Sequence, residues 1–574
     1  MSIKKRTSTI IILIAALATL AGWSLDWGIS VGADYVHEIR KNIEIFGLVY
    51  SEISQKYVDQ VDPAKVLKAG INGMLGTLDP YTVLIEQEDN DQLQIMTTGK
   101  YGGLGMLIGP RDGWPTVVEP PYEGTPAQRA GIREGDQIIE VDGVVTKGMS
   151  TNDAASKLRG EVGTPVVVKI RREGEAEPIE FRLIRAEIVV HDVSYSGIVR
   201  DGIGYIKLTR FSRNAGHEIR EAIRQLRTQN AKGIILDLRN NPGGLLEQAV
   251  EVSENFVKKG DQIVSTRGRI EGSVQKYVSE KDPAAGTLPL VVLVNEFSAS
   301  ASEIVAGAIQ DLDRGVIVGA PTYGKGLVQT VVRLTGDAAL KVTTAKYYIP
   351  SGRLIQKESN LRKEQGDIFA EDEDAATTGA IDEKKQEVPA EQFQTAHGRD
   401  VFGGGGIKPD LEMKTPKLTQ FEIALLRKMM LFNFAIQYAA RHPELKPGFQ
   451  VDEKLLGELQ QFLADRHFTY ESDTEAQLEN LRKAAEEDGY LADIKTQFEA
   501  LQAALQAEKK DDFTKSRDFI RRSLEREISS KLWGTRAEVE AGFDDDPAIQ
   551  RAVNLLLSPD EYTGLLAGNG KVKG

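Results

Sequence analysis

The chain has 574 residues, enough for about three or four domains, and 41% of them are hydrophobic, which supports sizeable cores. Its formal net charge of −14 argues against a nucleic-acid-binding protein, because phosphate binding needs basic patches. The absence of cysteine excludes cysteine catalysis and thiolate metal sites, and no histidine or carboxylate pattern indicates another metal. We therefore expect neither a metal nor a cofactor.

Residues 1–25 have the pattern of a secretory signal or a membrane anchor. Basic residues at positions 4–6 precede an uncharged apolar run from Thr9 to Trp23. Ala16-Leu17-Ala18 offers a small-residue cleavage site, and the run is short for a membrane span, which needs about 20 residues. Extended through Leu25 it nearly reaches that length, so a cleaved signal and an uncleaved anchor both stay open. Either predicts export to the cell envelope, facing the periplasm or the exterior.

The next two segments predict a helical region at 30–98 and a small β domain at 99–186. Apolar residues three to four apart predict helix within Tyr35–Leu78, ended by a turn at 78–82. The loop Tyr101-Gly102-Gly103-Leu104-Gly105-Met106 combines the glycines and apolar residues of a carboxylate-binding loop. We expect Val166–Ile170 to form a late strand. The core of this domain should contain Val117, Ile138 and Val141.

A first strand–turn–helix unit follows. Residues 232–245 predict a strand and a glycine-rich turn, with a helix from Leu246 to Val257. Gly243 and Gly244 let backbone N–H groups approach a ligand closely, so the turn could contribute to an oxyanion hole. An ordinary connection between strand and helix explains the same residues equally well.

Ser300 lies on a second strand-to-helix turn. The apolar run Pro289–Asn295 predicts a buried strand, and helical spacing starts at Ser302. Free backbone N–H groups and the helix dipole favour a developing anion at such a turn. Ser300 is therefore a candidate nucleophile. The alternative is that alternating Ser and Ala residues only allow a helix end to pack closely, with one serine as its N-cap.

Lys325 is the candidate base, because a serine hydroxyl is a weak nucleophile and none of the six histidines lies in a segment like a catalytic loop. Two glycines flank Lys325 and apolar runs lie on both sides, so burial can lower its pKa from about 10.4. In an extended strand Gln329 would face the same side and could hold the amine with its amide oxygen. The alternative is a lysine that reaches the surface from a strand end.

The rest of the chain predicts an acidic surface insert at 359–398, within a unit at 187–415, and a helical C-terminal domain at 416–574. The insert includes Glu371-Asp372-Glu373-Asp374, and its low hydrophobicity is typical of a solvated loop. Thr419 and Glu422 form a capping-box pattern at the start of a helix through about Arg441. Further amphipathic runs are expected at 452–465, 475–509, 514–532 and 547–556.

The motifs DLRNNPGGLL, SASASE and YGKGLVQ at 237–246, 298–303 and 323–329 together resemble the C-terminal processing peptidases, or tail-specific proteases, which are serine proteases with a Ser-Lys dyad. The resemblance covers roughly residues 40–360 and Gly403–Asp410, with the motifs in the family's order. It implies an α/β multidomain protein with a ClpP/crotonase-like core. The implied site has Ser300 as nucleophile, Lys325 as base, Gln329 as support, and an oxyanion hole made by Ala301, Gly243 and Gly244.

The run Gly131–Gly143 resembles a PDZ domain of the bacterial protease-associated type. Such a domain would capture the C-terminal carboxylate of a polypeptide at Gly102, Gly103, Leu104 and Gly105, and would add the peptide as a strand. The resemblance also implies that Arg159 couples peptide binding to activation and that the N-terminal helices form a homodimer. A β domain used only for packing, a surface arginine, and helices that pack within one subunit are the alternatives.

The expected function is therefore an exported serine endopeptidase that cleaves polypeptides after engaging their C-terminal ends. The alternative is a non-catalytic PDZ scaffold that retains the protease fold.

Overall fold

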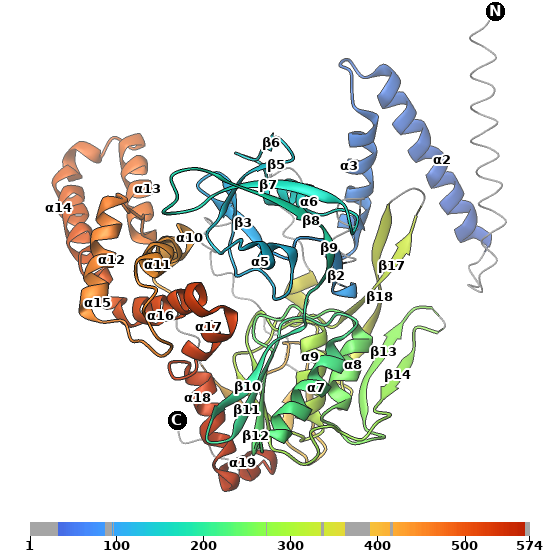
Figure 1. Cartoon of the computed structure of the whole chain (residues 1–574). Helices are drawn as coiled ribbons and strands as arrows, with labels where there is room; N and C mark the ends of the chain where they lie inside the picture. The colour runs from blue at the N-terminus through green and yellow to red at the C-terminus, as the bar shows by residue number, and fades with distance from the viewer. Residues whose placement is uncertain are drawn as a thin grey trace, which may run out of the picture.

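The computed structural model describes residues 33–85, 95, 97–270, 272–334, 338–361, 391–413 and 417–568. In chain order it contains a helical hairpin, a small β domain, an α/β core and a helical C-terminal domain (Figure 1), which confirms the expected fold class. The signal-like segment and residues 362–390 of the acidic insert lie outside the described residues. Within the described ranges, no helix combines the length and apolarity needed to span a membrane.

The N-terminal hairpin consists of helices α2 (Ala33–Lys56) and α3 (Pro63–Gly76). The single helical segment expected over 35–78 is therefore interrupted. Asp62 caps α3 by accepting the N–H of Ala64 at 2.9 Å, and a proline follows directly, so a new helix begins there. The hairpin stands out from the rest of the molecule (Figure 1), and α2 exposes large apolar side chains such as Ile43 and Leu48.

The small β domain is an antiparallel sheet with strand order β3-β4-β5-β7-β8, in which β6 (Val144–Val145) pairs with β5. The five strands are β3 (Ile108–Arg111), β4 (Trp114–Val117), β5 (Gln137–Val141), β7 (Pro165–Arg171) and β8 (Ile179–Ile184). Helices α5 (Pro126–Ala130) and α6 (Thr151–Leu158) complete the domain. Val117, Ile138 and Val141 are buried in its core, and β7 contains the predicted late strand, as expected. Strand β3 lies at a free edge of the sheet.

A two-stranded link joins this domain to the core. Strand β2 (Lys100–Gly103) enters the β domain, and β9 (Ala186–Val189) leaves it. The two strands pair antiparallel, with Tyr101 opposite Ile188. A rotation of the β domain relative to the core would therefore bend or twist this two-stranded link.

The core is a six-stranded sheet in the order β10-β11-β12-β15-β16-β21, mainly parallel. Its strands are β10 (Val193–Arg200), β11 (Ile203–Leu208), β12 (Gly233–Asp237), β15 (Leu290–Val294), β16 (Val316–Gly319) and β21 (Leu411–Glu412). One face packs on helices α7 (Ala215–Thr228), α8 (Leu246–Glu254) and α9 (Ala301–Asp311). The other face packs on α18 (Pro547–Leu556) and α19 (Pro559–Leu566). Burial on both faces explains the continuous apolar runs of β12 and β15.

A second sheet includes the strand that follows the candidate base in the chain. Its order is β1-β18-β13-β14, and β17 also pairs with β18. The strands are β1 (Val83–Ile85), β13 (Gln262–Gly268), β14 (Gln275–Val278), β17 (Leu327–Arg333) and β18 (Ala339–Tyr348). Short elements follow at η1 (Glu358–Leu361), β19 (Gln392–Gln394) and β20 (Asp400–Phe402). Lys325 lies in the loop that joins the first sheet to β17.

The C-terminal domain is helical, as predicted. It contains α10 (Gln420–Arg427), α11 (Met430–Arg441), α12 (Glu453–Asp465), α13 (Asp473–Glu487), α14 (Leu491–Lys509), α15 (Asp512–Lys515), α16 (Arg517–Trp533) and α17 (Thr535–Ala541). The Thr419–Glu422 capping box is present. Three expected helices are each divided. Met429 at φ 52° and Gly489 at φ 78° adopt left-handed conformations that end a helix, and the run expected at 514–532 divides at Ser516, between α15 and α16.

This helical domain contacts both the β domain and the core. Lys531 Nζ lies 2.6 Å from Glu134 Oε1, and both side chains are buried. Ile436 packs at Gly135, where an added Cβ would lie only 2.5 Å from Ile436 Cδ1. At the other end, Asp546 binds Arg239 of the core at 2.8 Å. The domain therefore fixes the β domain relative to the core.

Candidate active site

Ser300 forms the turn between β15 and α9. Its backbone has φ 56° and ψ −113°, which is a sparsely populated conformation for a residue other than glycine. Its N–H donates to Glu303 Oε2 at 2.8 Å. The neighbouring serines have structural bonds, since Ser298 Oγ donates to the Leu238 carbonyl and Ser302 Oγ to that of Asn241. Of the three serines, Ser300 lines the large cavity next to this turn.

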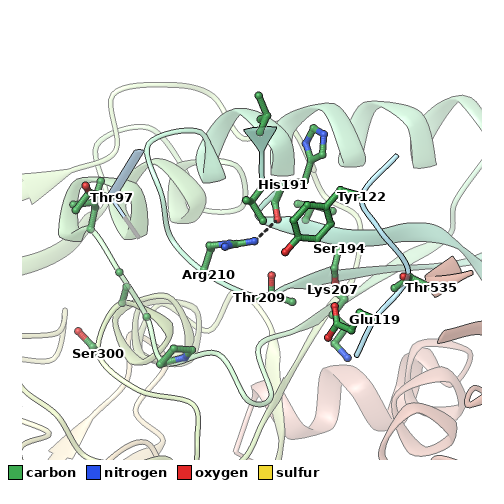
Figure 2. Close-up of a pocket in the computed structure, with 18 of the residues that line it drawn as sticks. Thr97, Glu119, Tyr122, His191, Ser194, Lys207, Thr209, Arg210, Ser300 and Thr535 are labelled. Carbon is green, nitrogen blue, oxygen red and sulfur yellow. Dashed lines mark hydrogen bonds between the residues drawn. The ribbon is translucent and has the colours of Figure 1, made fainter. Parts of the chain in front are cut away.

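The cavity has a volume of 1260 Å³ and walls from three parts of the chain. Figure 2 shows Ser300 on one side, with residues of the β domain, the core and the C-terminal domain farther along. Those residues include Glu119, Tyr122, Ser194, Lys207, Thr209, Arg210 and Thr535. The cavity at Ser300 therefore reaches residues of the β domain and of the helical domain.

Two backbone N–H groups near Ser300 can receive an oxyanion. Ala301 is the first residue of α9, so its N–H has no partner in the helix, and the Gly244 N–H also has no acceptor among the described residues. Gly243 differs from the prediction, because its N–H donates to Asn241 Oδ1 at 2.9 Å. Gly243 instead gives room, since a Cβ there would lie 2.9 Å from both Ser300 Cβ and Ala301 N.

Lys325 lines the same cavity and is largely buried. Burial, and then the nearby charge of Lys341, lower the pKa of its amine to about 8, while Glu303 and Asp79 oppose the shift. The expected desolvated lysine is therefore present. Within the described structure, no hydrogen bond joins Lys325 Nζ to Ser300 Oγ. Both residues therefore line one cavity, but the hydrogen bond needed for proton transfer between them is not formed in this structure.

Gln329 lines the cavity, and among the described residues no hydrogen bond joins its side chain to Lys325. Its Nε2 donates to Thr343 Oγ1 at 3.4 Å. The alternation expected from an extended strand does not apply, because Lys325 precedes β17 and the pairing of β17 with β18 shifts between Val328 and Gln329. The support of Lys325 by Gln329 stays a prediction.

Glu303 is a functional residue that the sequence reasoning missed. Its Oε2 accepts the N–H groups of Ser300 and Lys325, at 2.8 and 2.9 Å, and its Oε1 accepts the Gly324 N–H at 2.7 Å and the Thr322 hydroxyl at 2.5 Å. Burial raises its pKa to about 7, and these hydrogen bonds oppose the rise. One carboxylate thus fastens the loop of the base to the turn of the nucleophile. The Ser-x-x-Glu spacing of a capping box was the available signal.

Replacing Glu303 with glutamine should lower kcat at least about 100-fold and destabilise the fold by about 2–3 kcal/mol, because an amide nitrogen would face buried N–H donors. Peptide hydrolysis and chemical unfolding measure the two effects. Glu422→Gln, in the capping box of α10, is the matched control and should lose stability only. Wild-type kcat in the Glu303 variant would contradict this role.

Only part of the loop predicted to bind a carboxylate is free of strand pairing. Gly102 and Gly103 belong to β2 and pair with Glu187 and Ala186. The N–H groups of residues 104–106 donate to no described residue, while the carbonyls of Leu104 and Gly105 accept from Ala127 and Tyr122. Residues 104–106 directly precede β3, the strand at the edge of the sheet.

Arg159 ends α6 and lies at the link between the β domain and the core. Its guanidinium carbon lies 5.7 Å from the ring centre of Tyr101, which is in β2. A role of Arg159 in coupling stays a prediction.

The comparisons match all four parts of the chain. Family profiles match Peptidase family S41 at residues 202–362, a PDZ domain at 117–172, the C-terminal helical domain of a probable PDZ-protease at 421–556, and the N-terminal domain of the activating protease CtpB at 29–89. The β domain is therefore a PDZ domain.

Curated relatives agree. The carboxy-terminal-processing protease of Bartonella bacilliformis is 39% identical over 320 residues, which cover 55% of this chain and 73% of the relative. The carboxyl-terminal-processing protease of Synechocystis is 41% identical over 293 residues, covering 50% and 68%. Among solved structures, the photosystem II D1 C-terminal processing protease aligns at 28% identity and a TM-score of 0.34, covering 64% and 86%.

Proposed function

Since this chain belongs to the S41 family of carboxy-terminal processing proteases and is a serine-type peptidase with a PDZ domain, we propose that it is an exported endopeptidase that uses Ser-Lys acyl-enzyme chemistry. One observation carries the proposal: a buried lysine lines the same cavity as the strained serine turn, and Glu303 binds both backbones. Hydrolysis of an unstructured protein, followed by mass spectrometry, tests it.

In the proposed mechanism, the neutral Lys325 amine accepts the proton of Ser300 as Oγ attacks the scissile carbonyl. The resulting oxyanion receives the N–H groups of Ala301 and Gly244. Lys325 then returns the proton to the leaving amine, and water later hydrolyses the acyl-enzyme. No hydrogen bond joins the dyad in the described structure, so we expect this bond to form in the substrate complex.

A non-catalytic PDZ scaffold is the competing function. Such a protein has no need of a desolvated lysine, whose burial opposes its charged form. The lowered pKa of Lys325 therefore favours the enzyme. Absence of any cleavage with the PDZ domain still binding peptides would support the scaffold.

Substrates are proposed to engage the PDZ domain through their free C-terminal ends. A peptide ending in an apolar residue and a free carboxylate should bind the full-length Ser300→Ala variant at least about tenfold more tightly than its amidated twin, because a charge-assisted bond to each oxygen is lost in the amide. Calorimetry measures both affinities. Equal binding of acid and amide would remove carboxylate capture and leave the Ser300 chemistry untouched.

Export is proposed from the signal-like residues 1–25, with the protease in the periplasm, either free or held by its N-terminal segment. Fractionation of cells, with protease accessibility from the periplasmic side, tests this placement. Protein found in the cytosol would contradict it.

A homodimer through the hairpin is proposed from the apolar side chains that α2 exposes, among them Ile43 at 66% and Leu48 at 59%. Burying them would remove apolar area from water. Changing both residues to lysine should convert a dimer to a monomer in sedimentation equilibrium. A dimer that persists in this variant would place the interface elsewhere.

A further inference from the structure

The amine of the candidate base lies against an aromatic ring from outside the core. Lys325 Nζ is 4.6 Å from the centre of the Tyr81 ring. Tyr81 belongs to the segment that follows the N-terminal hairpin. Its hydroxyl donates to that of Tyr323, two residues before Lys325, at 3.3 Å. The ring is therefore a direct contact of the amine.

A turn holds Tyr81 firmly. Asp79 Oδ1 accepts the N–H groups of Tyr81 and Thr82, at 2.8 and 2.9 Å. Strand β1 then pairs with β18, with Val83 opposite Lys341. Thr82 Oγ1 also accepts the N–H of Thr343 at 3.2 Å. Since Thr343 Oγ1 accepts from the Gln329 amide, hydrogen bonds connect the turn at 79–82 to β17 and β18, the strands that follow Lys325.

The charged groups that shift the pKa of Lys325 lie on β18, on α9 and in the turn at 79–82. Lys341 on β18 repels the ammonium, whereas Glu303 on α9 and Asp79 in the turn attract it. In the described surroundings, no carboxylate makes an ion pair with Lys325. The face of an aromatic ring attracts a cation, and more strongly where water is excluded. The Tyr81 ring thus stabilises the charged amine that burial disfavours.

We propose that Tyr81 is a positioning residue for Lys325, and that its ring holds the amine by a cation–π contact at a fixed place beside the Ser300 turn. The proposal rests on the Ser-Lys chemistry proposed above. It gives the segment after the N-terminal hairpin a direct contact with the candidate base. It also gives the ring a definite electrostatic effect, which is to favour the charged amine.

Fluorination of the ring separates this effect from packing. A phenylalanine and a trifluorinated phenylalanine at position 81 have nearly the same shape, but fluorine weakens the negative face of the ring. In the fluorinated variant, the rising limb of kcat/KM against pH should move to lower pH by about 0.5–1 unit, because the charged amine loses part of its stabilisation. Tyr81→Phe should keep the wild-type limb. An identical limb in both variants would overturn the proposal.

Truncation tests the positioning. Tyr81→Leu should lower kcat about tenfold with little change in KM, because the amine loses its fixed place. Tyr81→Phe should restore kcat. Tyr490→Leu, on an exposed tyrosine of the helical domain, is the matched control and should behave as wild type. If Tyr81→Leu has wild-type kcat, or if Tyr81→Phe fails to restore it, the ring does not position the base.

The pKa of the amine can also be measured without catalysis, which allows variants of low activity to be tested. In the Ser300→Ala background, the pH dependence of Lys325 labelling by trinitrobenzenesulfonate reports the pKa of the amine, and the midpoint should fall on fluorination. An unchanged midpoint would refute the cation–π contact. An active Lys325→Arg enzyme would instead remove the proposed function, so the two failures can be told apart.

Discussion

Replacing Ser300 with alanine should abolish peptide hydrolysis and leave the fold and peptide binding intact. The hydroxyl is the nucleophile at the cavity, and losing it should cost a factor of at least about 10⁴ in kcat, as in other serine hydrolases. The Ser300 backbone, including its bond to Glu303, does not depend on the hydroxyl. Mass spectrometry of an unstructured protein incubated with the variant measures the loss, and thermal unfolding checks the fold.

The neighbouring serines are the matched controls. Ser302→Ala removes one buried hydrogen bond, to the Asn241 carbonyl, which should lower stability by about 1 kcal/mol. Ser298→Ala removes two, because Ser298 Oγ donates to the Leu238 carbonyl and accepts the Asn295 N–H, and should cost about 2 kcal/mol. Both variants should still cleave. Full activity of Ser300→Ala would move the nucleophile to another residue. The inactive variant would also serve as a trap, because substrates held in its cavity can be co-purified and identified.

Patterns of adjacent residues were enough to predict two parts of the site, the Ser300 turn and the desolvation of Lys325. The apolar run before Ser300 and the helical spacing after it predicted a strand-to-helix turn, and β15 and α9 confirm it. The glycines and apolar runs beside Lys325 predicted a desolvated amine, and burial in the structure does lower its pKa. In both cases adjacent residues were enough to suggest the local environment, although Lys341 and Asp79, far away in the chain, also act on the amine of Lys325.

Contacts between distant segments could not be read in this way. Tyr81 reaches Lys325 only because β1 pairs with β18, and no periodicity announces that pairing. The register shift after Val328 redirects Gln329 toward Thr343, whereas the expectation assumed regular alternation. Gly243 resembled an oxyanion donor until the Asn241 side chain was seen to occupy its N–H.

Helix ends show the same limit. The divisions at Met429 and Gly489 depend on left-handed backbone conformations. Gly489 offered a local signal, whereas methionine is rare at φ > 0 and gave none. Packing of α10 and α11 into one apolar cluster fixes that bend.

Lys325→Arg should inactivate the enzyme although it keeps the positive charge. A guanidinium does not lose its proton in the range where proteins are folded, so it cannot accept one from Ser300. In the wild type, kcat/KM should rise with pH through about 8, because only the neutral amine is a base and the pKa of Lys325 lies there. The pH profile of peptide hydrolysis measures this limb.

Lys341→Met provides the matched test of that assignment. Lys341 repels the ammonium of Lys325, so removing its charge should raise the pKa of the base and move the limb to higher pH. The expected shift is about half a unit, since the two amines interact across a partly solvated cavity. An active arginine variant would eliminate the dyad. If the rising limb of kcat/KM stays at the same pH in Lys341→Met, the titrating group is not Lys325. Glu303, whose buried carboxyl has a pKa of about 7, would be the next residue to test.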